Sequence, residues 1–235
     1  MANPYFQFKQ FTIRHDKCGM KVGTDGVLLG AWADVSQNTH HILDIGTGTG
    51  LVALMLAQRC EAEIVALEIE KEAAIQAKKN VEMSPWKERV SVVCEDFNSF
   101  VSERKFDVIV SNPPYFMDSL KSTDTQRSTA RHTDELTYYN LVFKAANLLN
   151  IHGHFSLIIP TKVVEIIREI ALVSHLYIVK QTDVLPTLKT LPKRSLLSLA
   201  FEQIDYEKEE LVIELSRHIY SKEYINLTKN YYLKM

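Results

Sequence analysis

The fold class of this 235-residue chain is decided by residues 42–50, which read Ile42-Leu43-Asp44-Ile45-Gly46-Thr47-Gly48-Thr49-Gly50. The apolar residues at the start predict a buried strand, and the three glycines predict a tight turn. An apolar run at 51–54 predicts a helix that begins at this turn. Glycines let backbone atoms approach a ligand where side chains would collide. We therefore expect a ligand here, although the glycine spacing differs from the GxGxxG pattern of dinucleotide sites, because the third glycine comes one position early.

Strand-like and helix-like segments alternate on either side of this turn. Short apolar runs predict strands at 42–45, 64–67, 90–94, 108–110 and 155–159, and the stretches between them predict helices at 51–59, 71–84, 135–150 and 161–173. This alternation predicts an α/β fold whose mostly parallel sheet has helices on both faces. Two further strands, 176–184 and 194–201, are joined by a link too short for a crossover helix, so we expect them to pair antiparallel.

The two ends of the chain have their own patterns. Residues 6–13 alternate apolar and polar side chains, and residues 15–19 are expected to turn this strand back as a hairpin. Residues 221–235 are expected to form a closing helix. We therefore predict a single domain, 1–235, with a hairpin extension at 1–30 and a closing segment at 221–235.

Composition excludes several classes of protein. The chain is 46% hydrophobic and 24% charged, as expected of a globular protein, and its longest uninterrupted apolar stretch, 51–57, is too short to cross a bilayer. Three separated cysteines form no CxxC pair, and the histidines lack metal-ligand spacing, so no metal is expected. The formal net charge of −2 gives no global attraction to a polyanion. We expect a cytoplasmic protein without a membrane segment and see no sign of an obligate protein partner; the oligomeric state is undetermined.

Acidic residues follow the next two predicted strands. Glu68 ends the strand at 64–67, where a carboxylate can accept hydrogen bonds from both hydroxyls of a ribose. Glu70 lies close by, but Glu68 is nearer the apolar run. Asp96 and Phe97 follow the strand at 90–94. Asp96 fits either an acceptor for the exocyclic amine of a purine, with Phe97 against the ring, or a helix N-cap.

These residues resemble the glycine turn, ribose acid and adenine acid of the class I S-adenosylmethionine-dependent methyltransferases. The match comprises Asp44, Gly46, Gly48, Gly50, Glu68 and Asp96, and it spans roughly residues 24–201. The resemblance implies a Rossmann-like fold with a seven-stranded, mostly parallel sheet that contains one antiparallel strand. It also implies S-adenosylmethionine as the cofactor.

A second motif, Asn112-Pro113-Pro114-Tyr115, follows the strand at 108–110 directly. Prolines fix the backbone and remove N–H donors, so carbonyl oxygens are left available. The side-chain oxygen of Asn112 and the carbonyl of Pro113 can accept both hydrogens of a planar NH₂ group, and Tyr115 can stack on its ring. Two such acceptors localise the nitrogen lone pair for attack on a sulfonium methyl group. We therefore predict a catalytic role for Asn112, Pro113, Pro114 and Tyr115.

The tetrapeptide resembles the [DNS]PP[YFW] signature of amino-methyltransferases. Together with residues 21–30, 84–86, 191–194 and the tyrosines of 220–232, it resembles the bacterial tRNA1(Val) (adenine-N6)-methyltransferase family almost end to end. The resemblance implies methylation of N6 of the adenine at nucleotide 37, next to the anticodon of a valine tRNA, and places Thr24 and Asp25 at the methionine end of the cofactor. Asn112 is expected to contact both cofactor and substrate.

An anticodon-loop base is unpaired, so extruding it costs less than extruding a base from a duplex. Cations near the predicted site are candidates for RNA contact: Lys121, Arg127, Arg131, Lys193 and Arg194. Residues 116–133 are expected to form a lid that orders on the substrate.

Three other functions fit parts of the pattern. Glutamine-N5 methyltransferases of release factors share Asn-Pro-Pro-Tyr but carry an N-terminal helical domain, for which residues 1–41 leave no room. Another RNA or DNA amino-methyltransferase would use the same chemistry. A cofactor-binding RNA chaperone without turnover would not need the amine acceptors.

Overall fold

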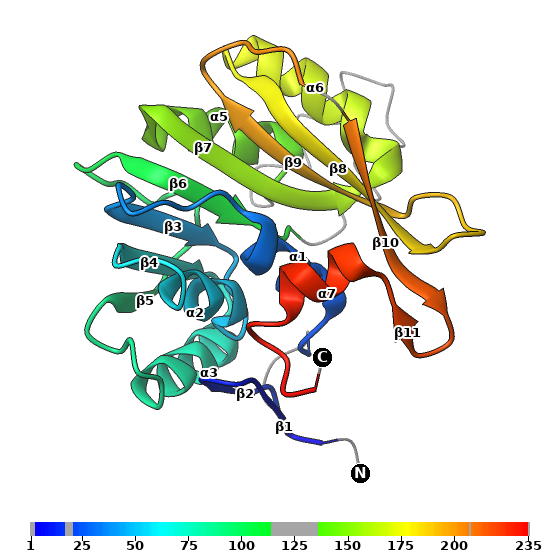
Figure 1. The fold of residues 1–235 in the computed structure, drawn as a ribbon. Helices are drawn as coiled ribbons and strands as arrows, with labels where there is room; N and C mark the ends of the chain where they lie inside the picture. The colour runs from blue at the N-terminus through cyan, green and yellow to red at the C-terminus, as the bar shows by residue number, and fades with distance from the viewer. Residues whose placement is uncertain (1–2, 17–20, 114–135, 207, 235) are drawn as a thin grey trace, which may run out of the picture.

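The computed structural model describes residues 3–16, 21–113, 136–206 and 208–234. A nine-stranded sheet runs through the molecule in the order β11-β10-β8-β9-β7-β6-β3-β4-β5 (Figure 1). Its strands are β3 (His41–Ile45), β4 (Glu63–Glu68), β5 (Val90–Cys94), β6 (Phe106–Ser111), β7 (Leu149–Pro160), β8 (Tyr177–Thr187), β9 (Arg194–Ala200), β10 (Lys208–Ser216) and β11 (Ile219–Tyr220).

The centre of the sheet is parallel and reverses its winding direction between β3 and β6. From β3 the chain winds outward through α2 (Leu51–Ala57) to β4 and through α3 (Lys71–Glu82) to β5. It then returns to β6, on the other side of β3, and continues outward to β7. Ligands of open α/β sheets bind at the carboxyl ends of the strands beside such a reversal. The fold thus defines the place for a site before any side chain is considered.

Helices cover both faces of the sheet, as the sequence predicts. On one face α1 (Thr24–Trp32), α2 and α7 (Lys222–Thr228) share a hydrophobic core with the sheet. On the other face α5 (Tyr138–Leu148) and α6 (Val164–Val173), which follows a short 3-10 turn η2 (Thr161–Val163), share a second core. Strand β3 supplies both cores, because Ile42 points to the first and Leu43 and Ile45 point to the second.

The predicted antiparallel pairing of the late strands is confirmed. Strand β9 lies between β7 and β8 and runs antiparallel to both. The seven strands from β5 to β8 form the expected sheet, but β10 and β11 extend it beyond β8. Strand β10 pairs parallel with β8, and β11 folds back antiparallel on β10. The sequence did not predict β10 because its first three residues, Lys208–Glu210, are charged and exposed, as is common at sheet edges.

The N-terminal hairpin is confirmed, but its turn lies elsewhere. Strands β1 (Tyr5–Gln7) and β2 (Thr12–Arg14) pair antiparallel, and the N–H of Phe8 donates to the carbonyl of Phe11 at 2.8 Å. The chain therefore reverses at 8–11, whereas most of the turn predicted at 15–19 lies outside the described residues. The rings of Phe8 and Phe11 stack with centroids 4.7 Å apart, which favours the earlier turn.

Helix α1 begins inside the segment 1–30 that the sequence assigned to the hairpin extension. Seven of its nine residues are buried, so no amphipathic pattern marks it as a helix. Its glycines permit close packing on α2, since a Cβ at Gly30 would lie 2.8 Å from the Cβ of Met55.

The closing helix is confirmed as α7. The tail after it lies beside the hairpin, where Phe8 and Tyr232 form an antiparallel bridge and the N–H of Lys9 donates to the carbonyl of Tyr231 (Figure 1). Among the helices of the described ranges, none is long and apolar enough to cross a membrane.

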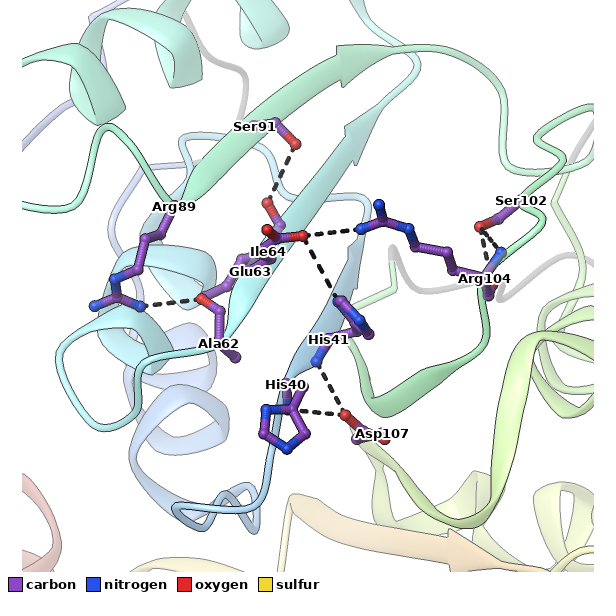
Figure 2. A network of polar contacts seen from close by, with 10 residues as sticks. All are labelled: His40, His41, Ala62, Glu63, Ile64, Arg89, Ser91, Ser102, Arg104 and Asp107. Carbon is purple, nitrogen blue, oxygen red and sulfur yellow. Dashed lines mark hydrogen bonds and ion pairs between the residues drawn. The ribbon is translucent and has the colours of Figure 1, made fainter.

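At the amino edge of the sheet, Asp107 joins β6 to β3 (Figure 2). Its carboxylate accepts from the backbone N–H groups of His40 and His41 at 2.8 and 3.0 Å and from the side-chain amide of Asn150. Burial alone would raise the pKa of Asp107, but these three donors lower it below its ordinary value. This clamp fixes β3 and β6 in register at the edge opposite the carboxyl ends.

Candidate active site

The glycine turn connects β3 to α2 as predicted. Gly46, Gly48 and Gly50 have φ of +71°, +57° and +82°, in the left-handed region that favours glycine. A Cβ built on Gly46 or Gly48 would meet no atom within 4 Å, because both face open space. Gly50 instead packs against Ala77 of α3. The turn thus presents bare backbone to a ligand at two of its three glycines.

The buried side chain of Asp44 stabilises the glycine turn through hydrogen bonds. Its carboxylate accepts from the hydroxyl of Thr47 at 2.6 Å and from the N–H of Ala53 at 3.1 Å, and the residue is only 1% exposed. Burial raises the pKa of Asp44 to about 7; the two hydrogen bonds oppose this rise and the nearby carboxylate of Glu68 adds to it. Asp44 therefore titrates near neutral pH, and a cationic ligand would favour its charged form.

The structure separates the two acids at the end of β4. Glu68 accepts from the N–H of Gly48 at 2.7 Å and from the N–H of Glu70 at 3.0 Å, so it lies against the glycine turn. Glu70 accepts from the N–H groups of Glu72 and Ala73 and caps α3. Because each carboxylate oxygen has two lone pairs, Glu68 keeps acceptor capacity for a diol. The preference for Glu68 over Glu70 agrees with this arrangement, and its contact with a ribose stays a prediction.

Asp96 and Phe97 form a turn after β5. Asp96 accepts from the N–H of Asn98 at 2.8 Å, and its carbonyl accepts from the N–H groups of Ser99 and Phe100. These bonds close a turn at 96–100, and no helix begins in the described segment between β5 and β6, so the helix N-cap that the sequence offered for Asp96 is wrong. The contact with a purine amine stays a prediction. The ring of Phe97 is 4% exposed and packs in the core below α5, with the ammonium of Lys144 5.4 Å from its centroid.

The end of β6 lies beside the end of β3. The hydroxyl of Ser111 donates to the carbonyl of Ile45 at 3.0 Å and joins the two strand ends. Directly after it, Asn112 and Pro113 line a cavity of about 550 Å³ together with Asp44, Gly46 and Gly48. Cavities of this size hold small ligands. The central prediction, that the Asn-Pro corner and the glycine turn face one cavity, is confirmed for Asn112 and Pro113.

The opposite wall of this cavity comes from the start of α1. Thr24 and Asp25 line it, as the resemblance implied, and the guanidinium of Arg194 binds the carboxylate of Asp25 at 2.9 Å. This ion pair joins α1 to the start of β9. The structure places the guanidinium of Arg194 on an acid of the cavity wall, and its predicted contact with RNA stays a prediction.

The other predicted residues lie apart from the cavity or outside the described residues. Lys193 is exposed beside Arg194, and its N–H donates to the carbonyl of Val184. Pro114, Tyr115, Lys121, Arg127 and Arg131, and the lid predicted for 116–133, lie outside the described residues.

The cavity also contains residues that the sequence analysis did not assign to it. They are Lys21, Gly23, Gly26, Thr47, Thr49, Leu51 and Val52. Thr47 and Thr49 alternate with the glycines, so their place in the turn is a signal that the sequence carried. Among the described residues, no group of three or more His, Cys, Asp or Glu could hold a metal ion.

Solved structures with the same fold are methyltransferases. A predicted O-methyltransferase from Agrobacterium tumefaciens superposes with a TM-score of 0.65 at 18% identity and covers 88% of this chain and 96% of its own. A glycopeptide N-methyltransferase in complex with S-adenosylmethionine covers 77% of this chain and 100% of its own, with a TM-score of 0.55 at 14% identity. The family model described as the methyltransferase small domain matches residues 24–169. Fold and cavity therefore define a Rossmann-like, S-adenosylmethionine-dependent methyltransferase.

Curated relatives narrow the class to one family. A tRNA1(Val) (adenine(37)-N6)-methyltransferase of Bacteroides thetaiotaomicron is 58% identical, and one of Bacteroides fragilis is 53% identical; in both, the alignment covers 100% of each chain. A relative of the same name from Flavobacterium johnsoniae is 48% identical over 98% of this chain and 100% of its own. The chain belongs to the tRNA1(Val) (adenine(37)-N6)-methyltransferase family.

Proposed function

We propose that this enzyme transfers the methyl group of S-adenosylmethionine to N6 of adenine 37 in tRNA1(Val), the reaction that the names of its full-length relatives state. The observation that carries the proposal is the shared cavity. Asn112 and Pro113 at the end of β6 and the glycine turn at the end of β3 line the same space. An amine acceptor and a methyl donor have to meet in line, and this space brings their binding groups together.

The cavity fits the cofactor. Gly46 and Gly48 leave room along the turn, and Glu68 has acceptor capacity for the ribose hydroxyls. The carboxylate of Glu68 lies against the turn, and a cationic ligand would favour the charged form of Asp44, which suits the sulfonium and ammonium groups of the cofactor. When bound, S-adenosylmethionine supplies an electrophilic methyl carbon.

The chain's own groups act on the acceptor amine. We infer that the side-chain oxygen of Asn112 and the carbonyl of Pro113 accept the two N–H bonds of the adenine amine. These bonds draw the nitrogen lone pair out of conjugation and stabilise the positive charge that develops on nitrogen during transfer. The cationic nitrogen formed by the transfer then loses one N–H proton to solvent, which leaves the neutral N6-methyl amine. Tyr115 is proposed to stack on the adenine.

The RNA substrate fits an enzyme of this size. Adenine 37 lies in a loop, so it can enter the cavity without the cost of opening a duplex. We propose that the chain acts as a single domain, in the cytoplasm where tRNA is found, and without an obligate protein partner. Lys193, Lys121, Arg127 and Arg131 are proposed to contact phosphates.

Mapping the methylated nucleoside tests this function. The purified protein is incubated with labelled S-adenosylmethionine and total tRNA from a strain that lacks the enzyme, and the labelled tRNA is then isolated and digested. We expect N6-methyladenosine at position 37 of one valine tRNA. Label in protein would instead support glutamine-N5 transfer, and label at another nucleotide would contradict the assigned substrate.

A further inference from the structure

We propose that a groove formed by the hairpin, the tail and the β10–β11 edge binds an unpaired nucleotide of the RNA substrate next to the target adenine. This inference rests on the proposed function, because it assigns a second contact to the same RNA. The groove has a volume of about 700 Å³. Its walls include Tyr5, Phe6, Tyr220, Tyr224 and Tyr232, and we refer to it as the aromatic groove.

Four of the five rings of this groove form a connected set. The centroids of Tyr220 and Tyr224 lie 5.4 Å apart, and those of Phe6 and Tyr232 lie 5.9 Å apart. The hydroxyl groups of Tyr224 and Tyr232 are 3.4 Å apart and link the two pairs. Packed rings of this kind are rigid, so a base that stacks on them meets a surface that is already ordered.

The rings differ in exposure. Buried rings support the groove, whereas exposed rings are available for contact with a base. Tyr224 is 3% exposed and forms part of the floor, whereas Tyr5 is 44% exposed and Tyr220 is partly exposed. Burial of the floor explains the raised pKa of Tyr224, to which the hydroxyl of Tyr232 adds. A structural role accounts for Tyr224 and Tyr232, which attach the tail to the hairpin. It does not account for the exposed face of Tyr5.

The aromatic groove adjoins the active-site cavity. Thr24, the first residue of α1, lines both this groove and the cavity that contains Asn112. An RNA strand that places one base in the cavity therefore has its neighbouring nucleotide within reach of the groove. Unpaired bases stack on Tyr and Phe rings in many RNA-binding proteins, because every base has a π-face.

Charge near the groove is compatible with RNA. Lys234 lines the groove and Lys21 lines the adjoining cavity, so each of the two spaces that share Thr24 has a lysine. One carboxylate, Glu214, also lines the groove. A stacked base with its phosphates toward the lysines satisfies this arrangement.

The test measures RNA binding separately from methyl transfer. Binding of a dye-labelled anticodon stem-loop with adenine at position 37 is followed by fluorescence anisotropy, with the demethylated cofactor at saturation. The variants are Tyr5→Ala, Tyr5→Phe, Tyr220→Ala and Tyr220→Phe. Phe143→Ala is the matched control, because Phe143 is 47% exposed but lies on α5, on the opposite face of the sheet.

We expect the alanine variants to raise the Kd for RNA roughly 5- to 100-fold, the range of one lost base stack, and the phenylalanine variants and Phe143→Ala to stay within about twofold of wild type. Stem-loops with one abasic nucleotide next to position 37 identify the stacked base. With the correct position abasic, Tyr5→Ala should no longer weaken binding.

Two results would overturn the proposal. One is an unchanged Kd for both alanine variants, including the case in which only their thermal stability falls. The other is an equal loss of affinity for intact RNA and for every abasic RNA, since stacking would then not be the cause. A wild-type enzyme that binds RNA through Tyr5 but methylates a different substrate would instead contradict the proposed function and leave the groove intact.

Discussion

Replacing Asp44 by Asn should remove a pH dependence of stability that the buried carboxyl imposes on the ligand-free protein. The pKa of Asp44 is about 7 in the folded chain, against an ordinary value of 3.8, chiefly because the group is buried. Between these two pH values the folded state binds a proton that the unfolded state has released. The free energy of unfolding must therefore fall as pH rises through this window.

The size of the effect follows from the same two values. Each pH unit changes the free energy of unfolding by about 1.4 kcal/mol per proton. The free energy of unfolding should therefore fall by about 4 kcal/mol between about pH 4 and pH 7. Asn has nearly the same shape as the protonated acid, and its side-chain oxygen can keep the bonds from Thr47 and Ala53. The variant should therefore retain the low-pH stability without losing it at neutral pH.

The assay is urea unfolding at about pH 5, 6, 7 and 8 for wild type and Asp44→Asn, without cofactor. Other titrating groups contribute to both curves, so the difference between the two free energies isolates residue 44. Asp107→Asn is the control: the pKa of Asp107 is lowered, so its titration falls below this window and its curve should run parallel to wild type between pH 5 and 7. A difference between wild type and Asp44→Asn that stays constant from pH 5 to 7 would refute the reasoning.

Three further substitutions test the site itself. Asn112→Ala should lower kcat about 100-fold or more while the Kd for S-adenosylmethionine, measured by calorimetry, stays nearly unchanged, because its contacts with the amine strengthen in the transition state; an equal loss of both would contradict this role. Glu68→Gln should weaken cofactor binding roughly 10- to 100-fold, since a hydrogen bond to a charged acceptor is worth about 1.5–3 kcal/mol, and the same titration checks it. Gly50→Ala should lower the free energy of unfolding by about 1–2 kcal/mol at a φ of +82°, although its Cβ would make only ordinary contact with Ala77; unchanged urea unfolding would show that the turn relaxes.

The sequence predicted the parallel core of the fold because local pattern and topology agree there. The runs 42–45 and 64–67 are largely apolar and buried, the run 90–94 is mostly apolar at the edge of the sheet, and β3, β4 and β5 coincide with them within a residue. Helix α1 and strands β10 and β11 escaped prediction, and α1 and β10 did so for opposite reasons. Helix α1 is buried on nearly every side and shows no periodicity, while the start of β10 is too charged to resemble a strand.

Some residues of the candidate site could be predicted from the sequence, and others could not. Asp44, the glycines and Glu68 are close in sequence to the strands that position them, so strand ends and turn chemistry suffice to predict them. The pairing of Asp25 with Arg194 joins residues that are 169 positions apart and depends on α1 packing beside β9, which no local pattern encodes. Asp96 shows a limit of another kind: an acid after a strand can cap a helix, close a turn or contact a ligand, and the structure shows the bond of a turn.

The active-site cavity and the aromatic groove are built from different parts of the chain, and the methyltransferase family model matches mainly the first of them. The family model of the methyltransferase small domain covers residues 24–169, which contain the glycine turn, Glu68 and Asn112. The five rings of the aromatic groove come from residues 5–6 and 220–232, outside that match, and only Thr24 belongs to both. The residues proposed to bind the cofactor and to accept the amine thus lie in the part that the methyltransferase family model matches. The hairpin and the tail pack on each other through the backbone bridge and stacked rings of Phe8 and Tyr232. They can therefore supply a substrate surface beside residues 24–169 without altering the geometry of the transfer site.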